Sequence, residues 1–269
     1  DDYTFEYTIK NTGAPDGVTA PMPEKNTIEI GNPESGKVNT NAFGAMTFEQ
    51  EGTYTYEITE TKGNHGGVTY DEHVATVTVT VTEDKAAGTL SAQVAYNNSA
   101  ALNDSDKAVQ DAAAFTNTYA STFDGETAVT LTGTKKMDVA DGFTYTLRDG
   151  GFYFNVTPVG DAPKVQTLVG NTGSAQVQDS NDWTSTMTLL NNLTFSMSDM
   201  DGASSKNFTY IVTEQIPQSG AAGVSYDETA YQVTITVTDD GKGTLSAGTP
   251  DIQKGSWDGT TFTPAAEAD

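Results

Sequence analysis

Two long segments of the chain have nearly the same sequence, and both contain a run of strictly alternating residues. Residues 67–92 read GVTYDEHVATVTVTVTEDKAAGTLSA, and residues 223–247 read GVSYDETAYQVTITVTDDGKGTLSA. In the first segment Val77, Val79 and Val81 alternate with threonines. Successive side chains of a β-strand point to opposite faces, and both residue types are β-branched and favour strands. Each segment therefore predicts a half-buried antiparallel strand, with valines in a core and threonines facing water.

The duplication extends upstream of these strands. The stretch GTYTYEITE at residues 52–60 matches KNFTYIVTE at residues 206–214. Further upstream, FEYTIKNTGAP at residues 5–15 weakly resembles FNVTPVGDAP at residues 154–163. Self-similarity over this length indicates two homologous domains rather than one large one.

The repeats predict an all-β fold with two tandem Ig-like/CnaB-like β-sandwich domains. We expect the first domain at residues 1–119 and the second at residues 128–269, joined by the short polar connection ASTFDGET. Each has the size of an immunoglobulin-like sandwich. The one segment that favours a helix is DKAVQDAAA at residues 106–114.

Charge and cysteine content exclude several classes of function. The 269 residues carry 13 Lys+Arg against 37 Asp+Glu, a formal net charge of −24. This argues against binding nucleic acid, which needs a basic surface, and against docking on anionic lipid. The chain has no cysteine, which excludes disulfides, thiolate metal sites and cysteine nucleophiles. No apolar run reaches the roughly 18 residues of a membrane-spanning helix, so we expect no membrane insertion.

The residues that usually carry catalysis are sparse. The two histidines, His65 and His73, are expected to be solvated on the surface, and no motif of a hydrolase or a phosphate-binding loop is present. The acidic turns at residues 199–204 and 238–243 lack the distal glutamate of a calcium loop, so ordinary turn chemistry explains them better. We therefore expect no enzyme with turnover, no metal and no cofactor.

Two glutamates occupy an unusual place in the alternating pattern. Glu60 follows Tyr54, Tyr56 and Ile58 on the predicted apolar face of its strand, and Glu214 has the same place in the second repeat. A carboxylate that points into a core is costly unless it is paired or protonated. Two interpretations are open: both acids point inward, or each ends its strand and turns out to solvent.

The combined pattern resembles a known family. It consists of Y-x-I/V-x-E, then G-V-T/S-Y-D, the Val/Thr strand, GTLSA, and finally FTNTY at residues 115–119. This pattern resembles the pilin isopeptide-linkage repeats of Gram-positive surface proteins, relatives of the streptococcal major pilin. The resemblance covers nearly the whole chain, twice, and it implies an extracellular protein attached to the cell wall.

The resemblance also implies a chemistry. In this family a lysine on the first strand bonds to an asparagine on the last strand, assisted by a buried acid that polarises the asparagine carbonyl and transfers protons as ammonia leaves. By position, the second domain offers Lys135, with Lys136 as a neighbour that could be confused with it, and the acid Glu214. The first domain offers Glu60 and Asn117. The reaction is at most a single autocatalytic turnover.

Each domain departs from the family pattern in one respect. The first domain begins at DDYTFEY, just after the expected lysine, and the second stops at FTPAAEAD, just before the expected asparagine. We therefore expect the first strand of one domain and the last strand of the other to lie outside these residues, with neighbouring repeats as partners. The alternative is that the missing residues have been replaced and the bonds lost.

Two functions compete at this point. The first is a structural stalk or shaft of a bacterial surface protein. The polymerising Y-P-K type motif of shaft pilins is absent, which favours a stalk within a longer adhesin. The second is a module that binds a host protein or glycan, for which the extra segment at residues 148–185, containing Trp183, is the candidate surface. Exposed aromatic residues there would favour binding, and buried ones would favour a stalk.

Overall fold

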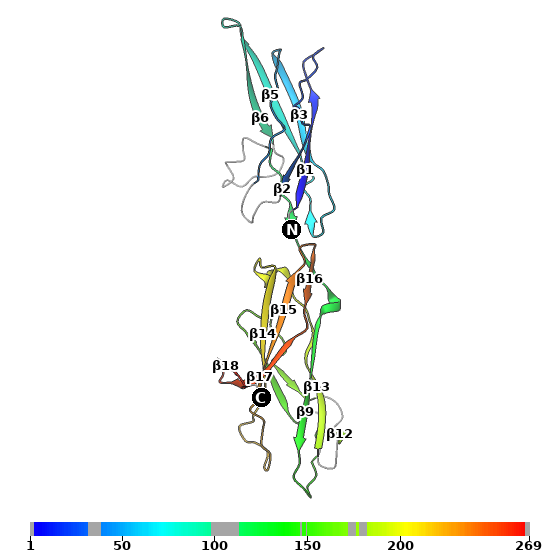
Figure 1. The fold of residues 1–269 in the computed structure, drawn as a ribbon, viewed down its shortest axis with the longest axis vertical. Helices are drawn as coiled ribbons and strands as arrows, with labels where there is room; N and C mark the ends of the chain where they lie inside the picture. Colours follow the sequence, from blue (N-terminus) through cyan, green and yellow to red (C-terminus); the bar gives the residue numbers. More distant parts are fainter. Residues whose placement is uncertain are drawn as a thin grey trace. The chain divides into compact units, whose positions relative to one another are not determined.

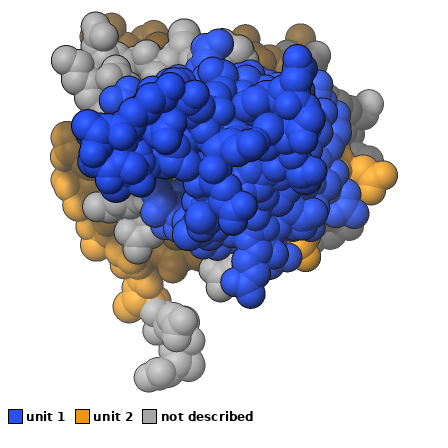
Figure 2. Space-filling model, turned by 90° about the horizontal axis from the view of Figure 1, so that it is seen from above, with its two compact units in different colours: residues 1–119 blue, residues 120–269 orange. Residues whose placement is uncertain are grey.

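The protein is described by a computed structural model, which covers residues 3–31, 39–97, 113–145, 147–148, 150–171, 176–177 and 182–266 (Figure 1). The chain divides into two compact units, residues 1–119 and residues 120–269 (Figure 2). Both are built almost entirely of β-strands.

Unit 1 contains seven strands within the described residues: β1 (Thr4–Gly13), β2 (Thr27–Gly31), β3 (Gly52–Glu60), β4 (Val68–Thr69), β5 (Val74–Asp84), β6 (Thr89–Asn97) and β7 (Thr118–Tyr119). The elements of unit 2 are β8 (Thr122–Phe123), a 3-10 turn (Gly125–Thr127), β9 (Val129–Asp138), β10 (Tyr153–Val159), β11 (Leu168–Gly170), β12 (Gln176–Val177), β13 (Asp182–Leu193), α1 (Met197–Met200), β14 (Ser205–Glu214), β15 (Ala230–Asp239), β16 (Thr244–Ala247), β17 (Asp251–Trp257) and β18 (Phe262–Pro264).

The main sheet of unit 1 has the order β2-β1-β3-β5-β6, and all of its pairings are antiparallel. Its core-facing side follows the alternating pattern, because Val77, Val79 and Val81 are buried while the threonines between them are half-buried or exposed. Tyr54 and Tyr56 on the neighbouring β3 are fully buried beside them. The predicted half-buried strand is confirmed.

The core of unit 1 is also covered by a short two-stranded ladder and by side chains from segments that form no strand. Strands β4 and β7 form a separate two-stranded ladder. Between β2 and β3, where the described residues carry no strand, Phe43, Met46 and Phe48 pack against the core. The Phe48 ring lies 4.8 Å from that of Tyr54. Side chains from irregular segments therefore form much of the second layer.

The described residues of unit 2 form two sheets. The larger has the order β11-β10-β14-β15-β16-β8, with β17 also pairing with β15 and β18 with β17. The smaller has the order β12-β13-β9. The core includes buried side chains from both, such as Val156, Phe208 and Ile235 from the larger sheet and Val129 and Leu190 from the smaller one. The predicted fold, all-β with two tandem β-sandwich domains, is confirmed.

The connection between the two repeats is part of a sheet. Strand β8 runs parallel to β16, with Phe123 opposite Leu245. The Phe123 ring packs 5.9 Å from that of Phe195, and the Ser121 hydroxyl donates to Asp239 at 2.8 Å. A polar sequence had suggested a simple linker, but this segment is bound to unit 2 by backbone pairing and by one aromatic side chain.

The strand register corrects one alignment of the repeats. Tyr7 lies opposite Glu60 and Phe154 lies opposite Glu214, so Tyr7 and Phe154 are counterparts. Phe5 therefore corresponds to Phe152, and not to Phe154 as the weak sequence match had paired them. Most of the predicted helix at residues 106–114 lies outside the described residues, and Ala113 and Ala114 are not helical. Across the described residues, no helix is both long and apolar enough to span a membrane.

Candidate functional site

The acid of unit 2 points into the core. Strand β14 carries Phe208, Tyr210 and Val212 on its buried side, and Glu214 continues this series at the end of the strand with 8% of the residue exposed. Pairing with β10 and with the start of β15 holds this end of the strand on both sides. Of the two interpretations left open by the sequence, the inward-pointing one describes Glu214.

Lys135 lies directly against this acid. On β9 the residues of the inward series alternate with exposed ones, and Lys135 belongs to the inward series. Its Nζ donates to both carboxylate oxygens of Glu214, at 2.8 Å each, and lies 4.6 Å from the centre of the Phe152 ring. The adjacent Lys136 is half exposed and pairs with Asp138 instead. The structure thus brings together the lysine and the acid that the family resemblance had selected.

The acid of unit 1 is surrounded by three donors. The Asn117 Nδ2 donates to Glu60 Oε1 at 2.6 Å, and the Tyr7 hydroxyl donates to the same oxygen at 3.3 Å. The backbone N–H of Asp71 donates to Glu60 Oε2 at 3.1 Å. Glu60 is half-buried, and it too faces the site rather than bulk solvent.

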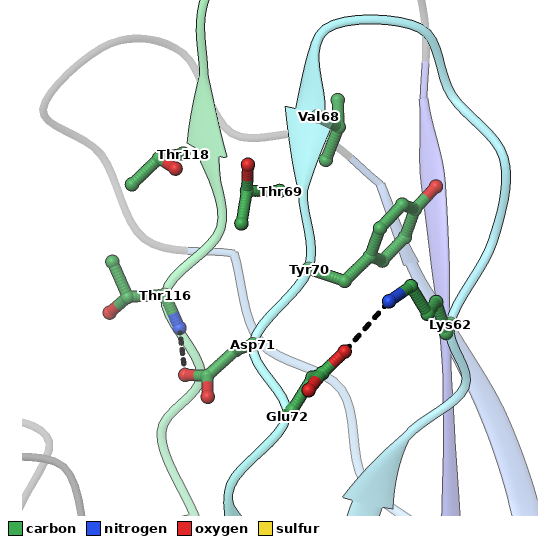
Figure 3. Close-up of a pocket in the computed structure, with 8 residues that line it drawn as sticks. All are labelled: Lys62, Val68, Thr69, Tyr70, Asp71, Glu72, Thr116 and Thr118. Atoms are coloured by element: carbon green, nitrogen blue, oxygen red, sulfur yellow. Dashed lines mark hydrogen bonds and ion pairs between the residues drawn. The ribbon is translucent and has the colours of Figure 1, made fainter.

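The segment 115–117 is fixed residue by residue. The Phe115 ring packs 4.9 Å from the ring of Tyr7. The Thr116 N–H donates to Asp71 Oδ2 at 2.8 Å (Figure 3). The Asn117 Oδ1 accepts from the Asp71 N–H at 2.7 Å. Pairing of β7 with β4 then anchors the residues that follow.

The orientation of the Asn117 carboxamide differs from the expected one. The family chemistry suggested that the acid polarises the asparagine carbonyl. In the structure Glu60 receives the NH₂ group, and the carbonyl oxygen faces the backbone N–H of Asp71. The two reacting partners of the expected bond are thus divided between the units: asparagine with acid in unit 1, and lysine with acid in unit 2.

Sequence reasoning missed the role of the Tyr-Asp pair in the repeated G-V-T/S-Y-D motif. The Tyr70 hydroxyl accepts from the His65 N–H at 3.1 Å, and the Tyr226 hydroxyl accepts from the Ala221 N–H at 3.4 Å. Each tyrosine thus closes the loop before it. The next residue places its N–H on the acid, because Asp227 N donates to Glu214 Oε2 at 3.2 Å as Asp71 N does to Glu60. The identical tripeptide Y-D-E in both repeats was the available signal.

The Asp side chains of this motif are held as carboxylates. Burial of the Asp71 carboxyl opposes its ionisation, but hydrogen bonds from Thr116 N, from His73 N and from the His73 ring outweigh this, and its pKa lies below the ordinary value. The pKa of Asp227 is also lowered, chiefly by hydrogen bonds from Thr229 and further by the charge of Lys135. Burial, with the negative charge of Glu60, raises the pKa of Tyr7.

The prediction that both histidines are solvated on the surface is wrong. The side chain of His73 is 11% exposed, and its Nδ1 lies 2.6 Å from Asp71 Oδ1. Its ring stacks on Phe115 at 4.5 Å. His65 is half-buried and packs 4.5 Å from Tyr3. Packing from segments distant in sequence covers both rings.

The remaining candidate sites have structural explanations. The turn that begins at Asp199 is bound by Lys206, whose Nζ contacts the Asp199 carbonyl oxygen, the Asp201 carboxylate at 2.6 Å and the Asp161 carboxylate. Among the described residues, no cluster of three or more His, Asp or Glu side chains is arranged to hold a metal ion. An open hollow in unit 1 lies beside Asp71 and is lined by Tyr70, Glu72 and Thr116 among others (Figure 3).

Comparison with known proteins identifies the family of both domains. A family model described as FctA, the Spy0128-like isopeptide containing domain, matches residues 1–120 and again residues 130–264. The chain belongs to this family. FctA-type domains are a family of Gram-positive pilin domains that contain isopeptide bonds. Both acid sites lie in domains of this family.

Solved structures of pilins are similar to the chain over most of its length. The major pilin from Streptococcus pyogenes is 17% identical, with 91% of this chain and 89% of that chain covered and a TM-score of 0.37. The T-13 major pilin of Streptococcus pyogenes is 16% identical, with 99% and 86% covered and a TM-score of 0.30. Among curated proteins, no sequence matches the chain.

Proposed function

We propose that the chain is a structural stalk or shaft segment of a Gram-positive surface protein, whose sandwich domains are closed by covalent Lys–Asn bonds. The observation that carries this proposal is the pair of equivalent acid sites. Glu60 holds the carboxamide of Asn117 at 2.6 Å, and Glu214 holds the ammonium of Lys135 at 2.8 Å. Each site presents one reaction partner, in contact with the acid that the reaction requires.

The fold supports a mechanical purpose for such bonds. A sandwich resists pulling only as strongly as the hydrogen bonds and packing between its terminal strands, and a covalent link between those strands bypasses both. The sequence has no cysteine for disulfides, so an isopeptide bond supplies the cross-link by another route. The net charge of −24 suits this role, because like-charged surfaces repel neighbouring stalks.

The proposed chemistry takes place once per site. Formation of the bond consumes both side chains, so the acid assists maturation and not a turnover reaction. We place the protein outside the cell, attached to the cell wall, with neighbouring repeats of the same protein as its partners. This placement rests on the pilin family of the domains.

The alternative is a module that recognises a host protein or a glycan. The segment 148–185 was the candidate surface, and its aromatic side chains bear on the choice between the two functions: Phe154 and Trp183 are half-buried. Phe152 and Val169 are buried. Tyr153 is 42% exposed, but its ring lies over the backbone at Gly170, where an added Cβ would approach it to 3.2 Å. These contacts favour the stalk.

The test is intact mass spectrometry of the longest natural form of the protein, compared with the 269-residue chain. We expect the natural form to be lighter than its calculated mass by one ammonia for each complete site. Lys135→Ala should abolish the loss assigned to unit 2, and Lys136→Ala, which changes the exposed neighbour, should retain it. A natural form at its full calculated mass would contradict the covalent part of the proposal.

A further inference from the structure

We propose that the backbone N–H of Asp71 is the group that activates the Asn117 carbonyl, while Glu60 acts on the departing nitrogen. This inference rests on the proposed function and assigns the roles within its site. It begins from the two shortest contacts of the asparagine side chain: Oδ1 to the Asp71 N at 2.7 Å, and Nδ2 to Glu60 Oε1 at 2.6 Å.

The orientation of the carboxamide follows from the donors around it. A backbone N–H can only donate, so the Asn117 atom facing Asp71 must be the oxygen. If the amide were reversed, its NH₂ group would face another donor, and its oxygen would face Glu60, which could then bond only as the protonated acid. The backbone N–H therefore fixes the orientation of the carboxamide, with its NH₂ group toward the acid.

The same N–H is present in the second site. Asp227 N donates to Glu214 Oε2 at 3.2 Å, in the unit where the acid holds Lys135. In unit 1 the N–H lies closer to the Asn117 oxygen, at 2.7 Å, than to the acid, at 3.1 Å. The repeated loop thus places this N–H beside the acid in both units, whether the acid holds an asparagine or a lysine.

The side chain of Asp71 positions this donor and the asparagine together. Its Oδ2 accepts from Thr116 N, next to Asn117, at 2.8 Å (Figure 3), and its Oδ1 accepts from His73 N at 3.0 Å. Asp227 makes the corresponding bond with Thr229 N at 2.9 Å. The aspartate carboxylate thus bridges the loop that supplies the N–H and the segment that carries the carboxamide.

The reaction then divides as follows. When a lysine strand is present in unit 1, the ammonium of its lysine passes a proton to the Glu60 carboxylate. The uncharged amine then attacks Asn117 Cγ. As the C–N bond forms, the carbonyl π electrons move onto Oδ1, where the Asp71 N–H stabilises the negative charge. Glu60 transfers its proton to Nδ2 and takes one from the attacking nitrogen. The Cγ–Nδ2 bond breaks and ammonia leaves, so that the products are one amide, one ammonia and a protonated glutamate.

The experiment gives unit 1 a lysine strand copied from unit 2. A copy of residues 120–149 joined directly to Tyr3 keeps the spacing between Lys135 and Phe152, because Phe5 is the counterpart of Phe152. The rate of ammonia loss is followed by intact mass after refolding, and the Asn117 cross-link is located by peptide mapping. Position 71 is then changed in two ways: Asp71→Ala, which removes the carboxylate and keeps the N–H, and the α-hydroxy analogue of aspartate, which keeps the carboxylate and replaces the N–H by an ester oxygen.

We expect the ester to slow the reaction by about 10²- to 10³-fold, as loss of an oxyanion donor does in enzymes that transfer acyl groups. Asp71→Ala should slow it less, and Glu72→Gln, which changes the exposed neighbour of Asp71 that pairs with Lys62, should react at the wild-type rate. Asp71→Pro also removes the N–H and provides a second variant if the ester does not fold. An ester that reacts as fast as the unmodified chain overturns the role of the N–H and leaves the covalent bond itself intact.

A second measurement does not depend on the reaction. In the 269-residue chain, the ¹³Cγ resonance of Asn117 should move upfield when the N–H of residue 71 is removed, because its carbonyl loses a hydrogen bond. Glu72→Gln should leave this resonance in place. If the extended wild-type chain never loses ammonia, the proposed function fails, and this resonance still decides whether the N–H polarises the carbonyl. An unchanged resonance in the ester overturns the inference.

Discussion

The two units contain the same acid site in two different states. In unit 1 the acid holds a carboxamide, and in unit 2 it holds an ammonium. The side chain opposite the acid also differs: Tyr7 in unit 1, whose hydroxyl donates to Glu60, and Phe154 in unit 2, which has no hydroxyl. Despite these changes, the acid and the N–H beside it keep their arrangement. The site is therefore a property of the repeated strand and loop, and neither reaction partner is needed to form it.

A second difference lies at the GTLSA segment, which has the same sequence in both units. Leu245 in β16 is fully buried, whereas its counterpart Leu90 in β6 is 39% exposed. In unit 2 the parallel strand β8 places Phe123 beside Leu245, while β6 is the edge of its sheet. Identical residues thus acquire different burial because of what pairs with their strand.

The largest effect is expected from removal of the two acids. Glu214→Ala leaves the ammonium of Lys135 buried without its partner, which costs about 3–5 kcal/mol for a buried pair. Glu60→Ala leaves the Asn117 NH₂ and an N–H without an acceptor in a half-buried site, which costs about 1–3 kcal/mol. Urea unfolding measures both. Trp183 and Trp257, the chain's two tryptophans, lie in unit 2 and report on that unit, and tyrosine resonances report on unit 1.

The control for this prediction removes the whole pair. Lys135→Met combined with Glu214→Leu replaces two buried charges by apolar groups of similar size, and such exchanges are often neutral or stabilising. Equal losses in Glu214→Ala and in the double variant would show that packing, and not the uncompensated charge, sets the cost. Equal losses in Glu60→Ala and Glu214→Ala would remove the difference between the two sites.

The GTLSA comparison gives the next largest effect. Leu245→Ala should destabilise unit 2 by about 2–5 kcal/mol, because it leaves a cavity in the core. Leu90→Ala should cost well under about 1 kcal/mol, because its side chain is partly in water already. The matched pair is measured by the same urea titrations. A large loss for Leu90→Ala would mean that its strand edge is covered in solution.

The sequence predicted the fold from strict alternation, and it located Glu60 and Glu214 on the apolar face while leaving open whether they point inward. A period of two decides which face a side chain occupies, and this places Val79 in the core. Lys135 was selected over Lys136 by the family resemblance, and the structure puts it on the inner face of β9. The duplicated pattern then gave the two domains. These features depend on neighbours within one strand, which is the range over which sequence periodicity is informative.

The rest depends on contacts between distant segments. His73 was expected in water, but Phe115, which lies in the irregular segment before β7, covers its ring. The connection before β9 reads as a polar linker, yet one aromatic residue, Phe123, and the free edge of β16 turn it into strand β8. The role proposed for the Asp71 N–H involves no side chain of its own, so the repeated Y-D-E tripeptide marks the position of this group but not its function.

The Asp71 carboxyl predicts an acid sensitivity of unit 1. Because its pKa is lower in the folded chain than in the unfolded one, its contribution is complete at neutral pH and is lost as the pH falls through the folded pKa. Asp71→Asn should cost about 1–2 kcal/mol at pH 7, since hydrogen bonds to a charged acceptor are replaced by weaker ones. The measurement is the unfolding free energy of unit 1 from neutral pH down to about 3.

The variant should also flatten this pH dependence. With an amide at position 71, one of the groups that must take up a proton in acid is absent, so unit 1 should lose less stability between neutral and low pH. Asp227→Asn makes the same change in unit 2 and should leave the curve of unit 1 unchanged. A curve of unit 1 as steep in Asp71→Asn as in the wild type would mean that other carboxyls dominate.

The smallest effect tests the hydrogen bond from the Tyr7 hydroxyl to Glu60. Tyr7→Phe gives unit 1 the aromatic residue type of unit 2 and removes one long hydrogen bond to Glu60, at 3.3 Å, so it should cost about 1 kcal/mol or less at pH 7. The pKa of Tyr7 is raised in the folded chain, so the unfolded chain ionises first and stability falls as the pH rises above about 10. Tyr7→Phe should therefore lose less stability than the wild type in this range, as measured by alkaline unfolding of unit 1.

Tyr210→Phe, which removes the bond to the Pro163 carbonyl in unit 2, is the matched control. If Tyr7→Phe keeps the full alkaline loss, then the hydroxyl does not sense the carboxylate, and the two sites differ only in which of the two partners contacts the acid.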